Sequence, residues 1–210
     1  MPEFLWKDKD TDMIRVVGIS GKAGVGKDFV AKWLANQLPN SMIVAFADQL
    51  KINAMIQHSL SFEEVFEKKT NATRKLLQQT GTEQGRNIHG DDIWLRYMKI
   101  WITLHNQRMG VRTFIITDCR FQNEVEFVKQ FTNHVTIRVI APNRHAKRLA
   151  EENSQSDTTI TNHSSECDLD KSENLFDSCI YNDSEDDVFK QLYMMLPTFH
   201  QKLLYNKIEK

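Results

Sequence analysis

Hydrophobic positions along the chain fall into short β-branched runs, separated by longer stretches in which apolar residues recur at helical spacing. Strands are predicted at residues 14–19, 42–46, 113–118 and 135–140, with a weaker one at 178–181. The runs Val16-Val17 and Phe114-Ile115-Ile116 are apolar without alternation, which is typical of strands covered on both faces. We therefore expect a three-layer α/β fold in which helices flank a mostly parallel, five-stranded sheet.

Two segments depart from this alternation of strand and helix. Residues 48–110 read as a helical block inserted between the second and third strands, where it could cover a substrate. Residues 143–174 begin as a helix and end in a polar stretch whose apolar residues, from 151 onwards, are only Ile160, Cys167 and Leu169. Such a stretch buries little and predicts a lid or loop. A chain of 210 residues otherwise suits a single domain with one sizeable core.

The charge balance and the cysteine usage narrow the functional classes. Lys and Arg number 27 against 28 Asp and Glu, so no broad positive field exists to hold nucleic acid. The three cysteines lack C-x-x-C spacing and read as reduced thiols of an intracellular protein. No signal-like or membrane-spanning apolar run occurs in the sequence. We expect a cytoplasmic protein without a membrane partner.

His163 and Cys167 are four residues apart, but the sequence offers no further zinc ligands beside them. We therefore do not expect a structural metal.

A glycine-rich turn is the strongest chemical signal. Residues 21–27 fit the pattern G-x-x-x-x-G-K between a predicted strand and a predicted helix. Glycines let successive backbone amides curl around a phosphate, and the helix N-terminus adds its dipole. The pattern predicts an ATP site in which Lys27 reaches the β and γ phosphates; the alternative is a glycine-rich turn without a ligand. The predicted ATP-binding residues here are Gly21, Lys22, Ala23, Gly24, Val25, Gly26, Lys27, Asp28 and Phe29.

The position after the lysine departs from this pattern. A Ser or Thr hydroxyl usually follows the lysine and binds Mg²⁺, but here the residue is Asp28. Metal binding or the acceptor site must therefore differ from the usual arrangement, and the direct ligands of Mg²⁺ stay undetermined.

Charged residues also follow the strand at 113–118. Asp118 ends this strand where such folds need a carboxylate near Mg²⁺ and its waters. Arg120 and Glu124 come next, and they could neutralise charge during phosphoryl transfer. The alternative is a surface Arg–Glu pair that caps the following helix.

Two arginines lie one helical turn apart in the predicted lid. Arg144 and Arg148 are four residues apart and share one helix face, as expected of a lid that closes on ATP. A solvated basic helix is the alternative.

Five segments together resemble the phage-type deoxynucleoside monophosphate kinase family: 21–28, 46–51, 74–82, 92–94 and 118–124. They occur in the family's order and span about two thirds of the chain. That family has Lys-Asp at the end of the glycine turn, so Asp28 agrees with it. The departures are Gln49, where Pro is common, and residues 154–166, which match only at their end.

The resemblance implies a P-loop kinase that uses ATP and Mg²⁺ on a small-molecule nucleotide, and two copies could associate as a homodimer. If the gene is phage-encoded, the location is the host cytoplasm. Lys27, Asp118, Arg120 and Glu124 would be catalytic. Trp94 could stack on a base, although Trp101 two turns later suggests that both tryptophans are core. The implied deoxynucleotide-binding residues are Asp28, Asp48, Lys51, Arg74, Lys75, Gln78, Gly81, Thr82, Trp94 and Arg120.

Two other functions stay open. Lys-Asp after the glycine turn also occurs in animal-type phosphomevalonate kinases, whose acceptor is likewise a monophosphate. A nucleotide-controlled switch would need a guanine-reading N-K-x-D or T-K-x-D tetrapeptide, and the sequence has none.

Overall fold

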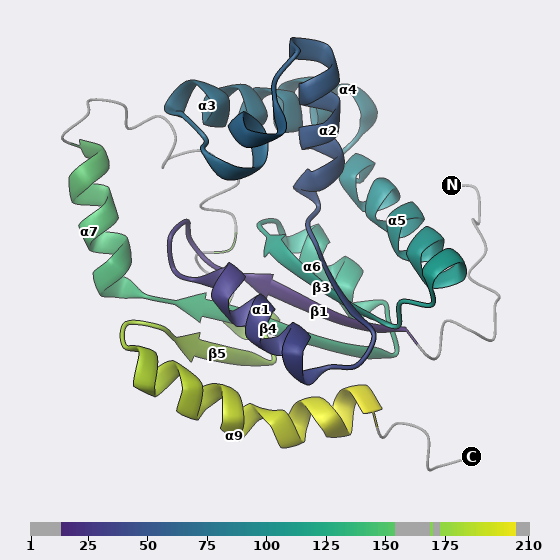
Figure 1. Ribbon diagram of the computed structural model, residues 1–210, viewed down its shortest axis with the longest axis vertical. Coiled ribbons are helices and arrows are strands. Elements are labelled where there is room, and N and C mark those ends of the chain that lie inside the picture. Colours follow the sequence, from purple (N-terminus) through teal and green to yellow (C-terminus); the bar gives the residue numbers. More distant parts are fainter. Residues whose placement is uncertain (1–13, 154–168, 170–172, 205–210) are drawn as a thin grey trace.

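A five-stranded parallel sheet forms the centre of the molecule (Figure 1). The computed structural model describes residues 14–153, 169 and 173–204. The strand order is β2-β3-β1-β4-β5, and every neighbouring pair is parallel. The three-layer α/β prediction is confirmed, and the five predicted strands are present within about two residues of their predicted ends. The strands are β1 Arg15–Ser20, β2 Ser41–Val44, β3 Thr113–Cys119, β4 Asn133–Ile140 and β5 Ser178–Tyr181.

Each face of the sheet carries its own core, because successive side chains of a strand point to opposite faces. Helices α1 (Lys27–Gln37) and α9 (Glu185–Leu204) cover one face. There Val17 and Ile115 lie among buried residues. Helices α5 (Ile93–Met109) and α6 (Gln122–Lys129) belong to the other side, with Val16 and Phe114 in its core. Burial on both faces explains the strands' uninterrupted apolar runs.

The segment between β2 and β3 is helical and rises above one end of the sheet (Figure 1). We call it the insertion. Its core is continuous with that of the sheet, because Leu50, Leu77 and Trp94 belong to the same buried cluster as Phe114. Besides α5, its elements are α2 Ala47–His58, η2 Glu63–Glu67, α3 Asn71–Gln79, η3 Thr80–Arg86 and α4 Asn87–His89.

Helix α7 (Pro142–Asn153) follows β4 and projects from the edge of the sheet (Figure 1). A short turn, η4 (Glu173–Leu175), leads into β5. Most of the predicted lid loop lies outside the described residues, and so do His163 and Cys167. Among the residues that the structure describes, no helix has the length and apolar character needed to cross a membrane.

Candidate active site

The glycine turn joins β1 to α1 at the edge of the sheet where its parallel strands end. Gly21, Gly24 and Gly26 have φ angles of 150°, 82° and 93°, which residues with a Cβ rarely adopt. Gly26 caps α1 in the left-handed conformation, and a Cβ there would collide with the side-chain amide of Asn182. The conformation explains why glycine occupies these positions and leaves the loop's backbone open to a phosphate.

Lys27 folds back over the turn that precedes it. Its Nζ donates to the carbonyl oxygen of Gly21 at 2.7 Å and to that of Lys22 at 2.9 Å. The ammonium therefore lies against the loop and at the first turn of α1. Asp28 and Phe29 follow on the exposed side of that turn, and the Phe29 ring packs edge-on against Phe189, with centroids 5.4 Å apart.

Asn182, directly after β5, holds the glycine turn in place. The side chain is 1% exposed, and its Nδ2 donates to the carbonyl oxygen of Val25 at 2.8 Å. Its backbone amide donates to the carbonyl oxygen of Ile140 at 2.8 Å. Asn182 is not among the residues predicted from the sequence, because its local signal is no more than an Asn directly after a weakly predicted strand.

Asp118 ties the start of the insertion to the sheet. Its carboxylate accepts hydrogen bonds from the backbone amides of Phe46 at 2.7 Å and Ala47 at 3.0 Å. Burial raises the pKa of Asp118 above its ordinary value, opposed by Lys51 and by the Ala47 amide. The side chain lies at the strand end where the sequence predicted a carboxylate, and its remaining lone pairs could still hold a water of hydrated Mg²⁺.

Glu124 is buried at the start of α6, and its ion-pair partner is Arg86. Oε1 of Glu124 lies 2.6 Å from Nη2 of Arg86, while Oε2 accepts from the backbone amides of Arg120 at 2.7 Å and Phe121 at 3.2 Å. Glu124 thus does cap α6, but the guanidinium that pairs with its carboxylate belongs to Arg86 of the insertion and not to Arg120. No local pattern marks Arg86, which lies 38 residues away in the sequence.

The pKa of Glu124 gives a prediction for stability. Burial first, and then the nearby Asp118, raise this pKa from 4.5 to about 7, although the Arg120 amide and Arg86 oppose the shift. The folded state therefore holds the proton more tightly than the unfolded state, so stability is lost as the pH rises from 4.5 to about 7. Relative to Glu124→Gln, the free energy of unfolding should fall by roughly 1.4 kcal/mol per pH unit in this window.

Urea unfolding of the wild type and of Glu124→Gln at pH 5 and pH 7 measures this difference. Glu126→Gln on the exposed side of α6 is the matched control, and its stability should follow that of the wild type. Equal pH dependence in the wild type and Glu124→Gln would show that Glu124 ionises as easily in the folded chain as in the unfolded one.

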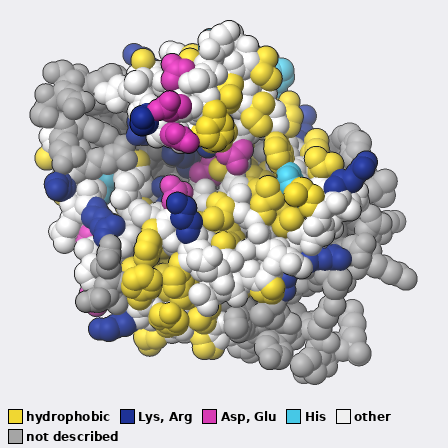
Figure 2. All heavy atoms as spheres, in the orientation of Figure 1, with side chains coloured by type: hydrophobic (Ala, Val, Ile, Leu, Met, Phe, Trp, Pro, Cys, Tyr) yellow, Lys and Arg dark blue, Asp and Glu magenta, His cyan; other side chains and the backbone are white. Residues whose placement is uncertain are grey.

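Several cations of the insertion lie near Asp28, which directly follows the glycine turn, and near Arg120. The pKa of half-buried Lys69 is lowered, first by burial and then by Lys51, Arg74 and Arg120, while Asp28 opposes the shift. These charges must lie near one another for this to occur. Figure 2 shows basic and acidic side chains together where this face is hollowed beneath the insertion. We call Lys51, Lys69, Arg74 and Arg120 the cation group.

The sequence predicted three members of the cation group but not Lys69. Lys69 directly precedes Thr70, whose hydroxyl accepts from the amide of Thr73 and caps α3. A paired Lys68-Lys69 before a helix is an ordinary surface pattern, so nothing local marked it. The exposed neighbour Lys68 pairs with Glu63 at 2.6 Å. Lys68 and Lys69 differ in burial and in charged neighbours, and this difference arises only when α2, α3 and the end of β3 come together in the fold.

The other predicted acceptor residues have varied surroundings. Asp48 accepts from Lys51 at 3.0 Å and from the Ala45 amide at 2.8 Å, so it orients Lys51 and fixes the chain that leads into α2. Gln78 and Thr82 are half-buried on the α3–η3 segment, and Lys75 is exposed there. The structure thus brings Asp28, Lys51, Arg74 and Arg120 together and leaves Lys75 on the surface.

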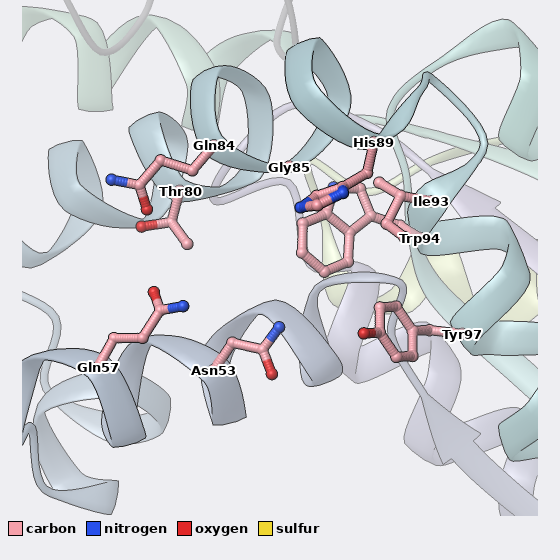
Figure 3. A pocket seen from close by; sticks show the side chains of 9 residues that line it. All are labelled: Asn53, Gln57, Thr80, Gln84, Gly85, His89, Ile93, Trp94 and Tyr97. Atoms are coloured by element: carbon pink, nitrogen blue, oxygen red, sulfur yellow. The ribbon is translucent and has the colours of Figure 1, made fainter.

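Trp94 lies beside Gly81 but faces a separate pocket of about 140 Å³ between α2, η3 and α5 (Figure 3). The indole is 6% exposed, and its Nε1 donates to the carbonyl oxygen of Gly81 at 2.9 Å. Asn53 also lines the pocket. It is two residues after Lys51, so the two side chains lie on opposite faces of α2. The pocket has no Lys, Arg, Asp or Glu in its wall, which consists of Asn53, Gln57, Thr80, Gln84, Gly85, His89, Ile93, Trp94 and Tyr97.

The two predicted lid arginines lie on α7. Nη1 of Arg144 would be 3.8 Å from a Cβ at Gly26, so this exposed guanidinium reaches the end of the glycine turn. The side chain of Arg148 is outside the described residues.

The described residues contain no cluster of three or more His, Cys, Asp or Glu side chains that could hold a metal ion. Mg²⁺ commonly binds through one or two carboxylates, waters and the phosphates of a nucleotide. Asp28, directly after the glycine turn, and Asp118, near the end of β3, are carboxylates that could serve in this way.

Comparison with known proteins adds three findings. The model of a protein family described as phosphomevalonate kinase matches residues 19–134. A protein of Acanthamoeba polyphaga mimivirus, whose name proposes a deoxynucleotide monophosphate kinase, is 26% identical over 138 residues, 57% of this chain and 71% of the relative. The crystal structure of TT1252 from Thermus thermophilus has a TM-score of 0.57 at 16% identity, covering 88% of this chain and 97% of that one. The last likeness concerns the fold alone.

Proposed function

This chain belongs to the phosphomevalonate kinase family, and we propose that it transfers the γ-phosphoryl group of ATP to a deoxynucleoside monophosphate, giving ADP and a deoxynucleoside diphosphate. The observation that carries the proposal is that two features suited to binding phosphate lie near each other. One is the glycine turn with Lys27. The other is the cation group around Lys69, which meets Asp28 at the end of that turn.

The proposed reaction is an in-line displacement at the γ phosphorus. An oxygen of the acceptor's phosphate forms the new P–O bond as the bond to the β-phosphate oxygen of ATP breaks, and ADP leaves. No covalent intermediate with the protein is needed, because positioning and charge stabilisation account for such catalysis. Both substrates are polyanions, so four cations gathered at the acceptor side reduce their repulsion.

Each part of the site has a proposed task. The amides of residues 21–26 and the first turn of α1 bind the ATP phosphates, and Lys27 neutralises the β and γ oxygens. Lys51, Lys69 and Arg74 hold the acceptor's phosphate. Arg120, at the end of β3, stabilises the group in transit. Bound Mg²⁺ would supply further charge neutralisation beside Asp118. Arg144 and Arg148 would cover ATP from α7.

Two considerations favour a nucleotide acceptor. The mimivirus relative has a name that proposes a deoxynucleotide monophosphate kinase. The segments at 74–82 and 92–94, which carry the resemblance to deoxynucleoside monophosphate kinases, contact each other in the insertion, where Nε1 of Trp94 donates to the carbonyl oxygen of Gly81. Phosphomevalonate is the second candidate, favoured by the family match over residues 19–134. Its phosphate would use the same cation group.

A substrate panel tests the proposal. ATP and Mg²⁺ are mixed with each deoxynucleoside monophosphate, each ribonucleoside monophosphate or phosphomevalonate, and ADP formation is followed by a coupled assay. We expect ADP to form in stoichiometric amounts with at least one deoxynucleotide. ADP formation with phosphomevalonate alone would establish the second candidate and reject the first. Lys27→Ala, purified in the same way, controls for contaminating kinases.

A further inference from the structure

Arg86 and Glu124 join the insertion to the transfer site through a buried contact. Their side chains are 8% and 4% exposed, and Nη2 of Arg86 lies 2.6 Å from Oε1 of Glu124. Arg86 belongs to η3 of the insertion, whereas Glu124 belongs to α6. A charge pair so well shielded from solvent is screened little by salt. It therefore fixes the end of η3 against the start of α6.

Further contacts surround this pair and give it one geometry. The guanidinium of Arg86 lies over the Phe121 ring, 3.8 Å from its centroid, and its Nη1 donates to the carbonyl oxygen of Asp91 at 3.2 Å. Asn123 donates to the same carbonyl oxygen at 3.1 Å. The planar guanidinium thus has a carboxylate, an aromatic face and a carbonyl as partners, an arrangement that lysine cannot reproduce.

The other oxygen of Glu124 reaches the proposed transfer site. Oε2 accepts from the backbone amide of Arg120 at 2.7 Å. One carboxylate therefore connects a guanidinium of the acceptor-bearing insertion to the main chain of Arg120. Movement of η3 relative to the sheet would disturb this bond, because both oxygens belong to the same rigid group.

We propose that Arg86 is a positioning residue for phosphoryl transfer: it holds Glu124, and through Glu124 it sets the Arg120 main chain relative to the insertion. This inference rests on the proposed function. In this role Arg86 acts only through Glu124. Its effect is to fix the Arg120 guanidinium at the transferred group once the insertion has taken up the acceptor.

Stability alone does not explain this buried pair. Desolvation of two charges offsets much of their attraction, so apolar residues of similar volume often stabilise a protein as well or better. Ionised Glu124 also costs stability, as its raised pKa indicates. A role in orienting Arg120 gives a reason for a charged group at this position.

Arg86→Met tests the proposal, because methionine keeps an unbranched apolar stem over Phe121 and removes the guanidinium. We expect kcat to fall about tenfold to a hundredfold, the range for residues that orient a functional group, while KM for ATP changes less than about twofold. In an Arg120→Ala background, the same substitution should lower kcat less than about twofold, since the group it positions is absent. Multiplicative losses would overturn the proposal.

Two further variants separate positioning from folding. Arg96→Met removes an exposed guanidinium of the insertion, which lies 3.4 Å from Asp92, and should leave kcat unchanged. Arg86→Lys keeps the charge and should recover only part of the lost activity. If Arg86→Met does not fold, the cycle with Arg120→Ala is run with Arg86→Lys, and an unchanged kcat would then overturn the proposal.

A measurement without substrates distinguishes this inference from the proposed function. Amide hydrogen exchange of Arg120, followed by NMR, should become at least about tenfold faster in Arg86→Met than in Arg96→Met, because Glu124 is no longer held as its acceptor. Unchanged exchange would reject the positioning role even in an active enzyme. Faster exchange in a protein that is inactive with every acceptor would keep the role and reject the proposed reaction.

Discussion

Lys27→Ala should lower kcat by about a thousandfold or more, the scale of losing a cation that stabilises charge in phosphoryl transfer. The ammonium lies where the glycine turn meets the first turn of α1, and it donates to the carbonyl oxygens of Gly21 and Lys22. Alanine leaves the amides of the turn in place but removes the charge that faces the β and γ phosphates. The coupled ADP assay measures the loss.

The fold should survive Lys27→Ala, because this half-buried side chain bonds to the loop and belongs to neither buried apolar cluster. Urea unfolding should place the variant within about 1 kcal/mol of the wild type. Lys32→Ala, on the exposed side of the same helix, is the matched control and should retain full activity. Undiminished turnover by Lys27→Ala would show that the glycine turn is not the ATP site.

Arg120→Ala should lower kcat by about a hundredfold to a thousandfold and change the affinity for ATP far less. Arg120 follows β3 and belongs to the cation group opposite the glycine turn, so its charge acts on the group in transit more than on bound ATP. Steady-state kinetics give kcat, and calorimetric titration with ATP gives the affinity.

The matched control for Arg120 is Arg108→Ala, an exposed residue in the last turn of α5, which should behave as the wild type. A parallel loss of ATP affinity and kcat in Arg120→Ala would show that Arg120 binds ATP in the ground state. An unchanged kcat would show that Arg120 takes no part in the transfer step. Arg86 would then have no catalytic group to position.

The two variants test different halves of the site. Lys27 and the glycine turn are contiguous in sequence, whereas the cation group draws on α2, α3 and β3. If Lys27→Ala is inactive and Arg120→Ala is fully active, ATP binds as proposed but Arg120 takes no part in the transfer step. The converse result would place the acceptor at the cation group and require another ATP site.

Local patterns were sufficient to predict the sheet and the glycine turn. Strand prediction succeeded because burial on both faces leaves an uninterrupted apolar run, as at Phe114 to Ile116, which both cores now account for. The turn was predictable because positive φ angles at Gly21, Gly24 and Gly26 demand glycine at fixed spacing. Asp118 and Arg120 could be placed beside the turn because parallel strands end at one edge.

Tertiary structure alone decided which distant side chains meet. Asn182 braces Val25 across 157 residues, and Arg86 pairs with Glu124 across 38. Lys69 differs from its neighbour Lys68 only in what the fold packs around it. The sequence by itself determined the strands, the phosphate-binding turn and the charged strand ends, because these depend on near neighbours. The partners of Glu124, the depth of Trp94 and the composition of the cation group depend on packing between elements, which no local period encodes.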